Sequence, residues 1–472
     1  MTTGLLVEGR SDMAISRRRL IRGGALALGT GAVMAACSPG GGGGDRIAQG
    51  KSDKEVTIRW STWDVSTGGF TTEAAPKGIK LFNEKFPKIK IVAEGQDGDW
   101  TTKNKTEWIA GTGPDMSGHC CTAGVQWARE GLFLDLEPKM KKDVPSKIRE
   151  DYVEWLIKLF NQPGAGQFGL PMYTGTLALY YNKTLFQKKG VAAPDDTWDW
   201  NKYREAAIKL NDPAAGIWGR RQVRGIDRVV QKIHQAGGNW VDPKDDTKPA
   251  FTSSEALQGL QYERDANVKD KYTSREGEVA NTQGLDLWKG VSAQRWGMWE
   301  EGSWILVRMA TLVEKDVVGQ WDVAPVPKGP KQRDTLATHD GWAIWKGTKN
   351  PDEAWEFLKF LQDDQWMEIA ATVVGHQPAR KSFQSRWVEL IKKGNPLLAD
   401  KNLKPFTDAI AQNYARPKEF FKKNQTEAET IINTFLNEAV YSSETSSAIK
   451  NGEKALDAAA KDAAARVADL MK

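Results

Sequence analysis

The chain has 472 residues, of which 40% are hydrophobic, with 20 Trp, 45 Gly and only 3 Cys. This length and Cys count exclude a small disulfide-stapled protein, and the apolar content excludes a disordered chain. The formal net charge is +5, but residues 1–36 carry five Arg against two acidic residues, which leaves about +2 for the rest. So small a basic excess predicts no nucleic-acid partner.

The N-terminus has the pattern of an export signal. Three consecutive Arg at 17–19 precede the uncharged stretch 23–36, and Cys37 follows directly. That stretch is too short to span a bilayer and is typical of a signal-peptide core rather than of a buried helix, the alternative interpretation. The paired Arg resemble a twin-arginine signal, and residues 34–37 resemble a bacterial lipobox. We therefore expect a signal over 1–36 and lipidation of Cys37.

A Gly-rich segment, residues 40–44, separates Cys37 from the body of the chain. Each Gly has a large backbone entropy to lose on ordering, so the segment predicts a flexible tether. With the lipidated Cys it forms the expected unit 37–52. The mature protein is then anchored by lipid at the outer face of a bacterial cytoplasmic membrane, on the cell surface or in the periplasm.

The body opens with alternating strands and helices. Residues 56–60 and 89–92 have strand character, 76–86 and 100–111 are predicted helices, and a third strand opens at Asp115. This β-α-β-α-β order predicts an α/β fold with parallel pairing. Ligands of such sheets bind beyond the carboxyl ends of the strands, which here means residues 63–64 and 119–122.

Three later segments also have clear patterns. Residues 177–181 have strand character, and Asn350 with Pro351 predicts a capped helix start. Residues 453–471 carry an apolar stripe that predicts a packed terminal helix, formed by Leu456, Ala460, Ala463, Val467 and Leu470.

Two segments resemble nucleotide-binding or metal-binding motifs, but neither has the local structure that such a site requires. Residues 164–169 match G-x-G-x-x-G, but Pro163 and Pro171 flank them where a nucleotide site needs a strand and a helix, so a turn is expected. Residues 119–121, His-Cys-Cys, are adjacent, and adjacent strand side chains point to opposite faces. Buried thiols or a vicinal disulfide are the competing interpretations, and we expect no metal and no cofactor.

Carboxylates leave one enzymatic alternative open. Glu300, Glu301 and Asp64 are able to supply the two acidic groups of a secreted glycoside hydrolase. The sequence does not give their separation.

The Trp residues fall into two groups. Four lie in periodic segments and are expected in the core, namely Trp60, Trp108, Trp155 and Trp355. Five others lie in or beside loops that contain Gly, namely Trp63, Trp240, Trp299, Trp304 and Trp342. The indole ring of Trp is rigid and apolar and has one polar N–H at its edge. Such a ring suits a ligand with one apolar face and many hydroxyls, such as a sugar ring.

An ordered series of short motifs makes the chain resemble a known family. The series comprises residues 59–64, 113–116, 127–136, 169–173, 179–183, 237–238, 299–304 and 341–344. In this order and spacing they resemble the family 1 extracellular solute-binding proteins of ABC importers, and the resemblance covers nearly all of 53–472. It implies an α/β, two-lobed, periplasmic-binding-protein-like fold of type II, with hinge crossings and a cleft between the lobes. The implied lobes are 53–172 plus 342–378, and 173–341 plus 379–472.

The same resemblance implies a ligand site. Asp64 matches an acidic residue that binds sugar hydroxyls, and Trp304 matches a stacking Trp. His119 takes the place of a stacking aromatic, Thr122 stands where the maltose binder has an Asp, and Gly175 replaces a carboxylate at the first crossing. With the loop residues added, the candidate ligand-binding set is Trp63, Asp64, His119, Thr122, Tyr173, Asp227, Arg228, Trp240, Trp299, Glu301, Trp304, Gly341 and Trp342.

These features together predict a binding protein and not an enzyme. The expected activity is capture of a sugar or oligosaccharide by lobe closure and delivery to the permease subunits of an ABC importer, by a monomer. Besides the hydrolase, the alternatives are a structural or adhesion lipoprotein, and a binder of a polyamine or peptide that pairs with Asp64, Asp227 and Glu301.

Overall fold

The computed structural model describes residues 47, 50, 54–63, 70–96, 99–119, 121–274, 285–441 and 456–472, with the backbone alone at 63, 71, 119, 121, 122, 285 and 286. All of these belong to one compact unit that begins at Asp45. The expected signal, Cys37, the Gly-rich tether, Asp64, Cys120 and residues 453–455 lie outside the described residues. Within the described ranges, no helix has the length and apolar character that a membrane crossing requires.

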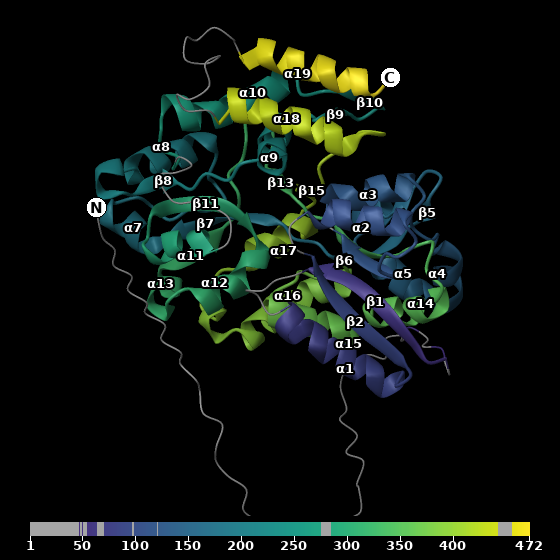
Figure 1. Ribbon diagram of the computed structural model, residues 1–472. Coiled ribbons are helices and arrows are strands. Elements are labelled where there is room, and N and C mark those ends of the chain that lie inside the picture. The colour runs from purple at the N-terminus through teal and green to yellow at the C-terminus, as the bar shows by residue number, and fades with distance from the viewer. Residues whose placement is uncertain are drawn as a thin grey trace, which may run out of the picture. The chain divides into compact units, whose positions relative to one another are not determined.

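A first sheet of five strands has the order β2-β1-β3-β14-β6 (Figure 1). β1 runs parallel to both β2 and β3, which confirms the predicted parallel pairing, and β14 is antiparallel to its neighbours β3 and β6. The strands are β1 (Val56–Trp63), β2 (Ile89–Gln96), β3 (Met116–His119), β6 (Gly169–Tyr173) and β14 (Asp340–Ile344). We call the part of the molecule built on this sheet the first lobe.

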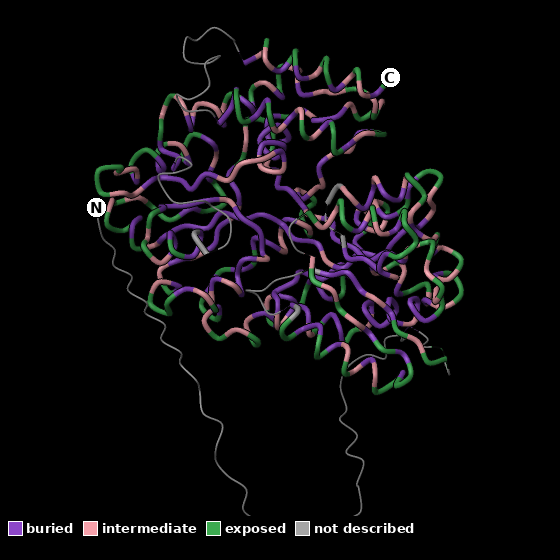
Figure 2. The backbone as a smooth tube through the Cα atoms, in the orientation of Figure 1, coloured by how far each residue is buried: buried purple, intermediate pink, exposed green. Residues whose placement is uncertain are grey.

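Helices cover the first sheet, and their apolar residues supply its core. Figure 2 shows the buried stretches of the chain in purple. They are α1 (Ala75–Lys85), α2 (Trp100–Ile109), α3 (Cys121–Arg129), α4 (Glu137–Asp143), α5 (Ser146–Asp151), α6 (Glu154–Leu159), α14 (Pro351–Phe360) and α15 (Asp364–Ile369), with π-helical turns η1 (Phe70–Ala74) and η5 (Ala370–Val374). Trp60 and Trp355 are core residues here, as expected, and Trp108 lies in the adjoining cluster.

A second sheet of four strands has the order β12-β7-β11-β8. β11 is antiparallel to β7 and parallel to β8, and β12 pairs with the other edge of β7. The strands are β7 (Leu177–Asn182), β8 (Trp218–Arg220), β11 (Trp296–Gly302) and β12 (Trp321–Ala324). The part built on this sheet is the second lobe.

The second lobe has its own helices and three main core clusters, one with residues of β11 and α12, one with residues of α9 and α18, and one with residues of α7 and α8. Its helices are α7 (Lys183–Lys188), α8 (Trp200–Leu210), α9 (Ile226–Ala236), α10 (Ser254–Arg264), α11 (Leu285–Ser292), α12 (Leu306–Leu312), α13 (Lys315–Gln320), α16 (Lys381–Gly394), α17 (Lys404–Ala411), α18 (Gln425–Ala439) and α19 (Leu456–Leu470), with short turns η2 (Pro213–Ala215), η3 (Asp265–Lys269), η4 (Ser303–Ile305) and η6 (Pro396–Leu398).

Three two-stranded ladders complete the structure. They pair β4 (Asn161–Gln162) with β5 (Gly166–Gln167), β9 (Val241–Asp242) with β10 (Asp245–Pro249), and β13 (Thr335–Leu336) with β15 (Ala415–Arg416). The first ladder explains the G-x-G-x-x-G motif, because Gly164 lies in the tight turn between its strands and Gly166 begins β5, both with positive φ. The motif is therefore a turn, as predicted.

The terminal helix α19 is packed, which confirms the interpretation of its apolar stripe. Leu456, Ala460, Ala463 and Val467 are buried, and Leu470 packs against the same core. α19 lies beside α18 in Figure 1. The pair closes the core that α9 and α10 share.

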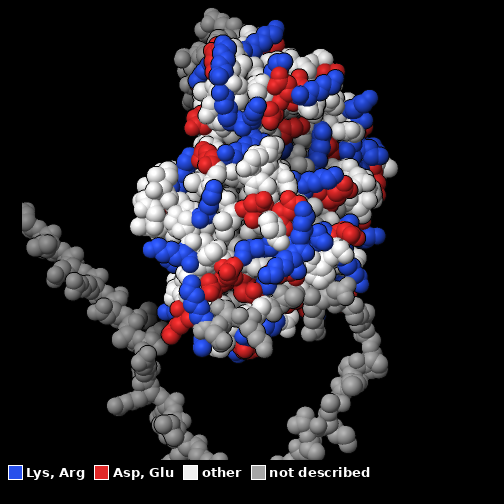
Figure 3. Space-filling view, turned by 90° about the vertical axis from the view of Figure 1, so that its right-hand side faces the viewer, with Lys and Arg blue, Asp and Glu red and all other residues white. Residues whose placement is uncertain are grey.

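The start of α14 differs from the prediction in one respect. Pro351 occupies the first turn as expected, but the side chain of Asn350 does not cap the helix. Its oxygen instead accepts a hydrogen bond of 2.7 Å from Lys54 Nζ. Figure 3 shows one face of the molecule, on which basic and acidic side chains are interspersed.

Candidate functional site

The chain passes between the two sheets at three segments that are joined to one another. Thr174 N donates to Gln377 O at 2.9 Å, which ties the first crossing to the third. Thr338 N donates to Gly175 O at 2.8 Å and Gly175 N donates to Thr338 Oγ1 at 2.9 Å, which ties the first to the second. We call these short connections the hinge, and the candidate site is the region where they leave the first sheet.

The first-lobe edge of this region is set by strand register. Gly341 lies opposite His119, and Asp340 lies opposite Tyr173, with an irregularity of β14 between Asp340 and Gly341. β1 and β3 are neighbours and end at Trp63 and His119. The predicted residues Trp63, His119, Tyr173 and Gly341 therefore share one edge of the sheet.

Some first-lobe predictions stay predictions. Asp64 lies outside the described residues, and the side chains of Trp63, His119 and Thr122 are likewise not described. Among the described residues, no three His, Cys, Asp or Glu side chains gather as metal ligands.

Tyr173 stacks on a histidine that the sequence had not singled out as a site residue. Its ring lies 4.2 Å from the ring of His376, with 12° between the planes. Burial, together with the charge of Arg308, lowers the pKa of His376 to about 3. His376 is therefore neutral at physiological pH, and its uncharged ring stacks on one face of Tyr173.

Asp340 is the second residue that the sequence analysis missed. Its side chain is 2% exposed, and burial raises its pKa to about 7 against the opposing effect of hydrogen bonds with Tyr173 and Thr338. The charge of Asp227 raises the pKa further. The signal was present in the sequence, because Asp340 directly precedes the predicted site residue Gly341.

Trp304 lies at the second-lobe side of the hinge, in η4. It is partly buried and packs against two of the second-lobe cores. Its ring lies against two glycines, and a Cβ placed on Gly175 would be 2.6 Å from Cε3 of the indole. The guanidinium of Arg228 lies 5.8 Å from the ring centroid. Trp304 is thus partly buried beside the first crossing, and its role as a stacking residue stays a prediction.

Arg228 and Glu301 are brought together, but as an ion pair. Arg228 Nη2 donates to Glu301 Oε1 at 2.6 Å, and Arg221 Nη1 lies 3.6 Å from Glu301 Oε2. Glu301 is buried, and its Oε1 also accepts a hydrogen bond from the backbone N–H of Gly302. The expectation that Glu301 is a ligand carboxylate is therefore replaced: it holds two arginines in place.

Asp227 begins α9 and pairs with a lysine. Lys418 Nζ lies 2.8 Å from Asp227 Oδ1, and Asp227 keeps 43% of its side chain exposed. Burial acts to raise the pKa of Asp227, but the charge and hydrogen bond of Lys418 lower it overall. Asp227 is therefore ionised at neutral pH and paired with Lys418.

Three of the five loop Trp are core residues, contrary to the prediction. Trp240 stacks on Phe251, Trp299 stacks on Tyr180, and Trp342 packs edge-on to Trp60. All three Trp are 0% exposed. In this structure they offer no surface to a ligand, and we remove them from the candidate site.

The physical reason is that neighbouring Gly residues make room for the indole rings. A Cβ on Gly118 would be 2.3 Å from Cζ3 of Trp342, and one on Gly290 would be 2.1 Å from Cη2 of Trp296. A Gly close to a Trp therefore indicates close packing against the indole ring as well as a loop. Trp155 also differs from its prediction in degree, because it is only partly buried.

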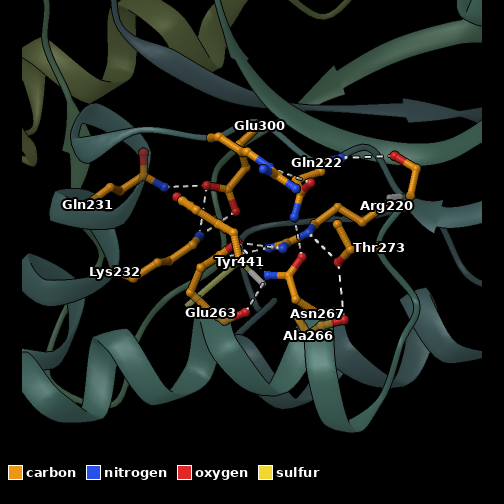
Figure 4. Close-up of polar contacts among 12 residues, drawn as sticks. Arg220, Gln222, Gln231, Lys232, Glu263, Ala266, Asn267, Thr273, Glu300 and Tyr441 are labelled. Carbon is orange, nitrogen blue, oxygen red and sulfur yellow. Dashed lines mark hydrogen bonds and ion pairs between the residues drawn. The ribbon is translucent and has the colours of Figure 1, made fainter. Parts of the chain in front are cut away.

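A buried polar network lies beside the site in the second lobe. Figure 4 shows Glu300 between Gln231 and Lys232, and Arg220 against Glu263. Lys232 Nζ is 2.6 and 2.8 Å from the two oxygens of Glu300. Both carboxylates of the Glu300–Glu301 pair therefore form ion pairs, Glu300 with Lys232 and Glu301 with Arg228.

The two lobes also touch away from the hinge. Thr426 Oγ1 at the start of α18 donates to Gln126 Oε1 of α3 at 2.7 Å. Arg129 Nη1 donates to Phe421 O at 2.5 Å. Beside these contacts is a cavity of about 240 Å³, lined by Val125 and Phe420 among others. We call the Gln126–Thr426 and Arg129–Phe421 contacts the clasp.

Comparison with known proteins assigns the chain to a family. Residues 67–368 match the model of the bacterial extracellular solute-binding proteins. A protein of Brucella abortus described only as a binding protein is 23% identical over 346 residues, which is 71% of this chain and 78% of that one. The diacetylchitobiose-binding protein DasA of Streptomyces coelicolor is 24% identical over 279 residues, 58% of this chain and 62% of that protein.

The fold is shared with solved structures. An ABC substrate-binding protein of Listeria monocytogenes, solved in complex with cycloalternan, superposes with a TM-score of 0.72 at 19% identity, covering 88% of this chain and 98% of that one. This confirms the predicted two-lobed, periplasmic-binding-protein-like fold. The chain belongs to the bacterial extracellular solute-binding proteins.

Proposed function

We propose that this protein captures a sugar or oligosaccharide between its lobes and delivers it to the permease subunits of an ABC importer. The observation that carries the proposal is the grouping of Trp304, Tyr173 and Asp340 where the crossing segments meet. An aromatic face covers the apolar C–H face of a sugar ring, while carboxyl and guanidinium groups bind its hydroxyls. The names of the relatives support a sugar, since one binds diacetylchitobiose and another was solved with cycloalternan.

The proposed lobes are residues 53–172 with 342–378, and 173–341 with 379–472. Closure of one lobe on the other shifts an open-closed equilibrium by as much as the ligand prefers the closed form. The reaction is binding without chemistry. The ion pairs of Glu300 with Lys232 and of Glu301 with Arg228 support this, because neither carboxylate is poised as the acid or nucleophile of a hydrolase.

The proposed location is the outer face of the cytoplasmic membrane, with residues 1–36 as a twin-arginine signal and lipid on Cys37. If this location is right, the wild-type protein is found in the membrane fraction. Cys37→Ala should release the protein from membranes without changing ligand affinity. Wild-type protein that stays soluble after export would contradict the anchor and leave the binding function intact.

A thermal-shift screen tests the binding function. Maltose, N,N′-diacetylchitobiose, D-tagatose and longer oligosaccharides are compared with spermidine and sn-glycerol 3-phosphate as charged controls. A ligand that binds only the folded state raises the melting temperature with its concentration. Stabilisation by the saccharides supports the proposal, whereas stabilisation by the charged controls alone, or turnover of aryl glycosides, overturns it.

A further inference from the structure

One half-buried arginine of the second lobe has no ionic partner. Arg308 lies in α12, and burial lowers the pKa of its guanidinium, because the charge is partly withdrawn from water. Among the described residues, no carboxylate acts on Arg308 and no acceptor takes a hydrogen bond from it. A charge removed from water is costly unless it is paired, so arginines in such a position usually have a counter-charge. We therefore looked for a counter-charge outside the chain.

The contacts of α12 place Arg308 at the hinge. Trp304 lies against Gly175 of the first crossing, and the turn η4 that holds Trp304 continues directly into α12. Val307 lies beside the third crossing, where a Cβ on Gly375 would be 2.9 Å from its Cγ2. Residues four positions apart share one face of a helix. Arg308 therefore lies on the same face of this segment as Trp304, next to the crossing segments.

The neighbours of Arg308 at the hinge are aromatic and uncharged. Its charge acts on both rings of the stack that Tyr173 forms with His376. The same charge contributes to the low pKa of His376, which is therefore neutral. A phenol also carries no negative charge at neutral pH. The stack thus supplies an aromatic surface beside Arg308 but nothing that neutralises its guanidinium.

The guanidinium of Arg308 remains in contact with solvent. Its side chain is half-buried, yet none of its nitrogens is fully enclosed. A second guanidinium, that of Arg228, lies 5.8 Å from the ring centroid of Trp304. Its Nη2 donates to Glu301, whereas its Nη1 is buried and has no hydrogen-bond partner among the described residues. The surroundings of Trp304 are therefore positively charged.

The described acidic side chains of the candidate site are engaged elsewhere. Asp227 is paired with Lys418, and Glu301 is paired with Arg228. Asp340 is 2% exposed and forms its hydrogen bonds within the hinge. None of these carboxylates neutralises the unpaired guanidinium on α12.

We infer that Arg308 binds an anionic oxygen group of the ligand, and that the ligand is an acidic saccharide, either a uronic acid or a sugar phosphate. This inference rests on the proposed function. The planar guanidinium matches two oxygens of a carboxylate or phosphate, and the indole of Trp304 on the same face suits the apolar side of the sugar ring. A neutral sugar would leave the charge of Arg308 without a partner, so the site should discriminate against it.

Isothermal titration calorimetry with matched sugars tests this inference. One set is D-glucose, D-glucuronate and D-glucose 6-phosphate, and the other is galactobiose and digalacturonate. In at least one set, an acidic sugar should bind wild type about 10-fold or more tightly than its neutral counterpart. The first set also distinguishes a carboxylate from a phosphate. Arg308→Gln should weaken binding of the acidic sugar by about 10- to 100-fold, as expected for loss of hydrogen bonds to a charged group, and leave the neutral sugar unchanged.

Further variants separate binding from folding. Arg308→Lys keeps the charge without the planar donor group and should give an intermediate loss. Arg466→Gln removes an exposed positive charge from α19 and should match wild type. Ligand-free Arg308→Gln should melt no lower than wild type, because the change breaks no ion pair.

Two results would count against the inference in different ways. If neutral sugars bind wild type at least as tightly as their acidic counterparts, or if Arg308→Gln keeps the preference for the acidic sugar, the inference is overturned while the proposed function stands. If no saccharide of either kind binds wild type, both are overturned.

Discussion

The indole of Trp304 lies against the backbone of Gly175, so close that a Cβ on Gly175 would be 2.6 Å from the ring. Gly175→Ala should therefore displace Trp304 or the first crossing. Overpacking of this kind costs about 1–3 kcal/mol of stability. We expect a lower melting temperature together with weaker saccharide binding, measured by thermal shift and calorimetry.

Gly319 provides the matched control for this substitution. It lies in α13, where a Cβ would have nothing within 4 Å. Gly319→Ala should raise stability by about 0.5–1 kcal/mol through the lower entropy of the unfolded chain, and leave affinity unchanged. Equal behaviour of the two variants would show that the contact between Gly175 and Trp304 has no influence on the site.

Removal of the Trp304 ring gives the second prediction. Trp304→Ala should weaken saccharide binding by roughly 1–3 kcal/mol, the range for loss of an aromatic contact in a binding site. Titration calorimetry measures the change. Trp345→Ala, which removes a partly buried Trp from the first-lobe core, should lower stability without changing affinity. Unchanged affinity in Trp304→Ala would exclude Trp304 from the site.

The clasp gives a prediction about closure. Gln126→Ala removes the acceptor for Thr426 Oγ1, which joins α3 of one lobe to α18 of the other. One hydrogen bond contributes about 0.5–1.5 kcal/mol, so the closed form and the saccharide affinity should weaken by roughly 2- to 10-fold. Thr430→Ala is the control, because that hydroxyl donates only to Thr426 O within α18. A variant with wild-type affinity would mean that the clasp also exists in the open form.

Glu301→Gln tests the ion pairs beneath the site. The change removes the negative charge between Arg228 and Arg221, of which Arg221 is 4% exposed at its side chain. Breaking a buried pair from one side leaves uncompensated charge and should lower the free energy of unfolding by about 3 kcal/mol, measured by urea denaturation. Glu154→Gln, in an exposed pair with Lys158, should cause no measurable loss. A small effect at Glu301 would instead return it to the list of ligand carboxylates.

His234 gives a prediction about pH. It is fully buried between two carboxylates, 2.8 Å from Glu419 Oε1 and 3.3 Å from Asp334 Oδ1. Burial acts to lower the pKa of His234, but hydrogen bonds with Asp334 and Glu419 raise it overall. The stabilisation is therefore complete below the unfolded pKa of about 6.5 and is lost as the pH rises through the higher folded value.

Urea denaturation between pH 6 and pH 9 measures this loss. The raised pKa of Asp340 changes stability in the same direction. It makes the folded state less stable as the pH rises from the ordinary carboxyl pKa to about 7. The comparison of His234→Gln with wild type is therefore made in the Asp340→Asn background. Equal slopes in the two proteins would show that His234 is neutral across this range.

The sequence predicted the architecture better than the site. Alternation of apolar segments depends on neighbours in the chain, so β1, β2, β3 and the helices between them were found within a few residues. Burial of Trp240, Trp299 and Trp342 depends instead on the neighbours that other segments bring to each ring, which are Phe251, Tyr180 and Gly118. Asp340 escaped notice for the same reason, since its partner Tyr173 comes from a distant segment and meets it only in the folded hinge.

The place of β14 in the first sheet has a consequence for synthesis. β14 lies between β3 and β6, yet it follows every strand of the second sheet in the chain. On the ribosome, the second sheet is therefore available before the first is complete. Until β14 emerges, β3 and β6 present unpaired edges of the kind that promote aggregation.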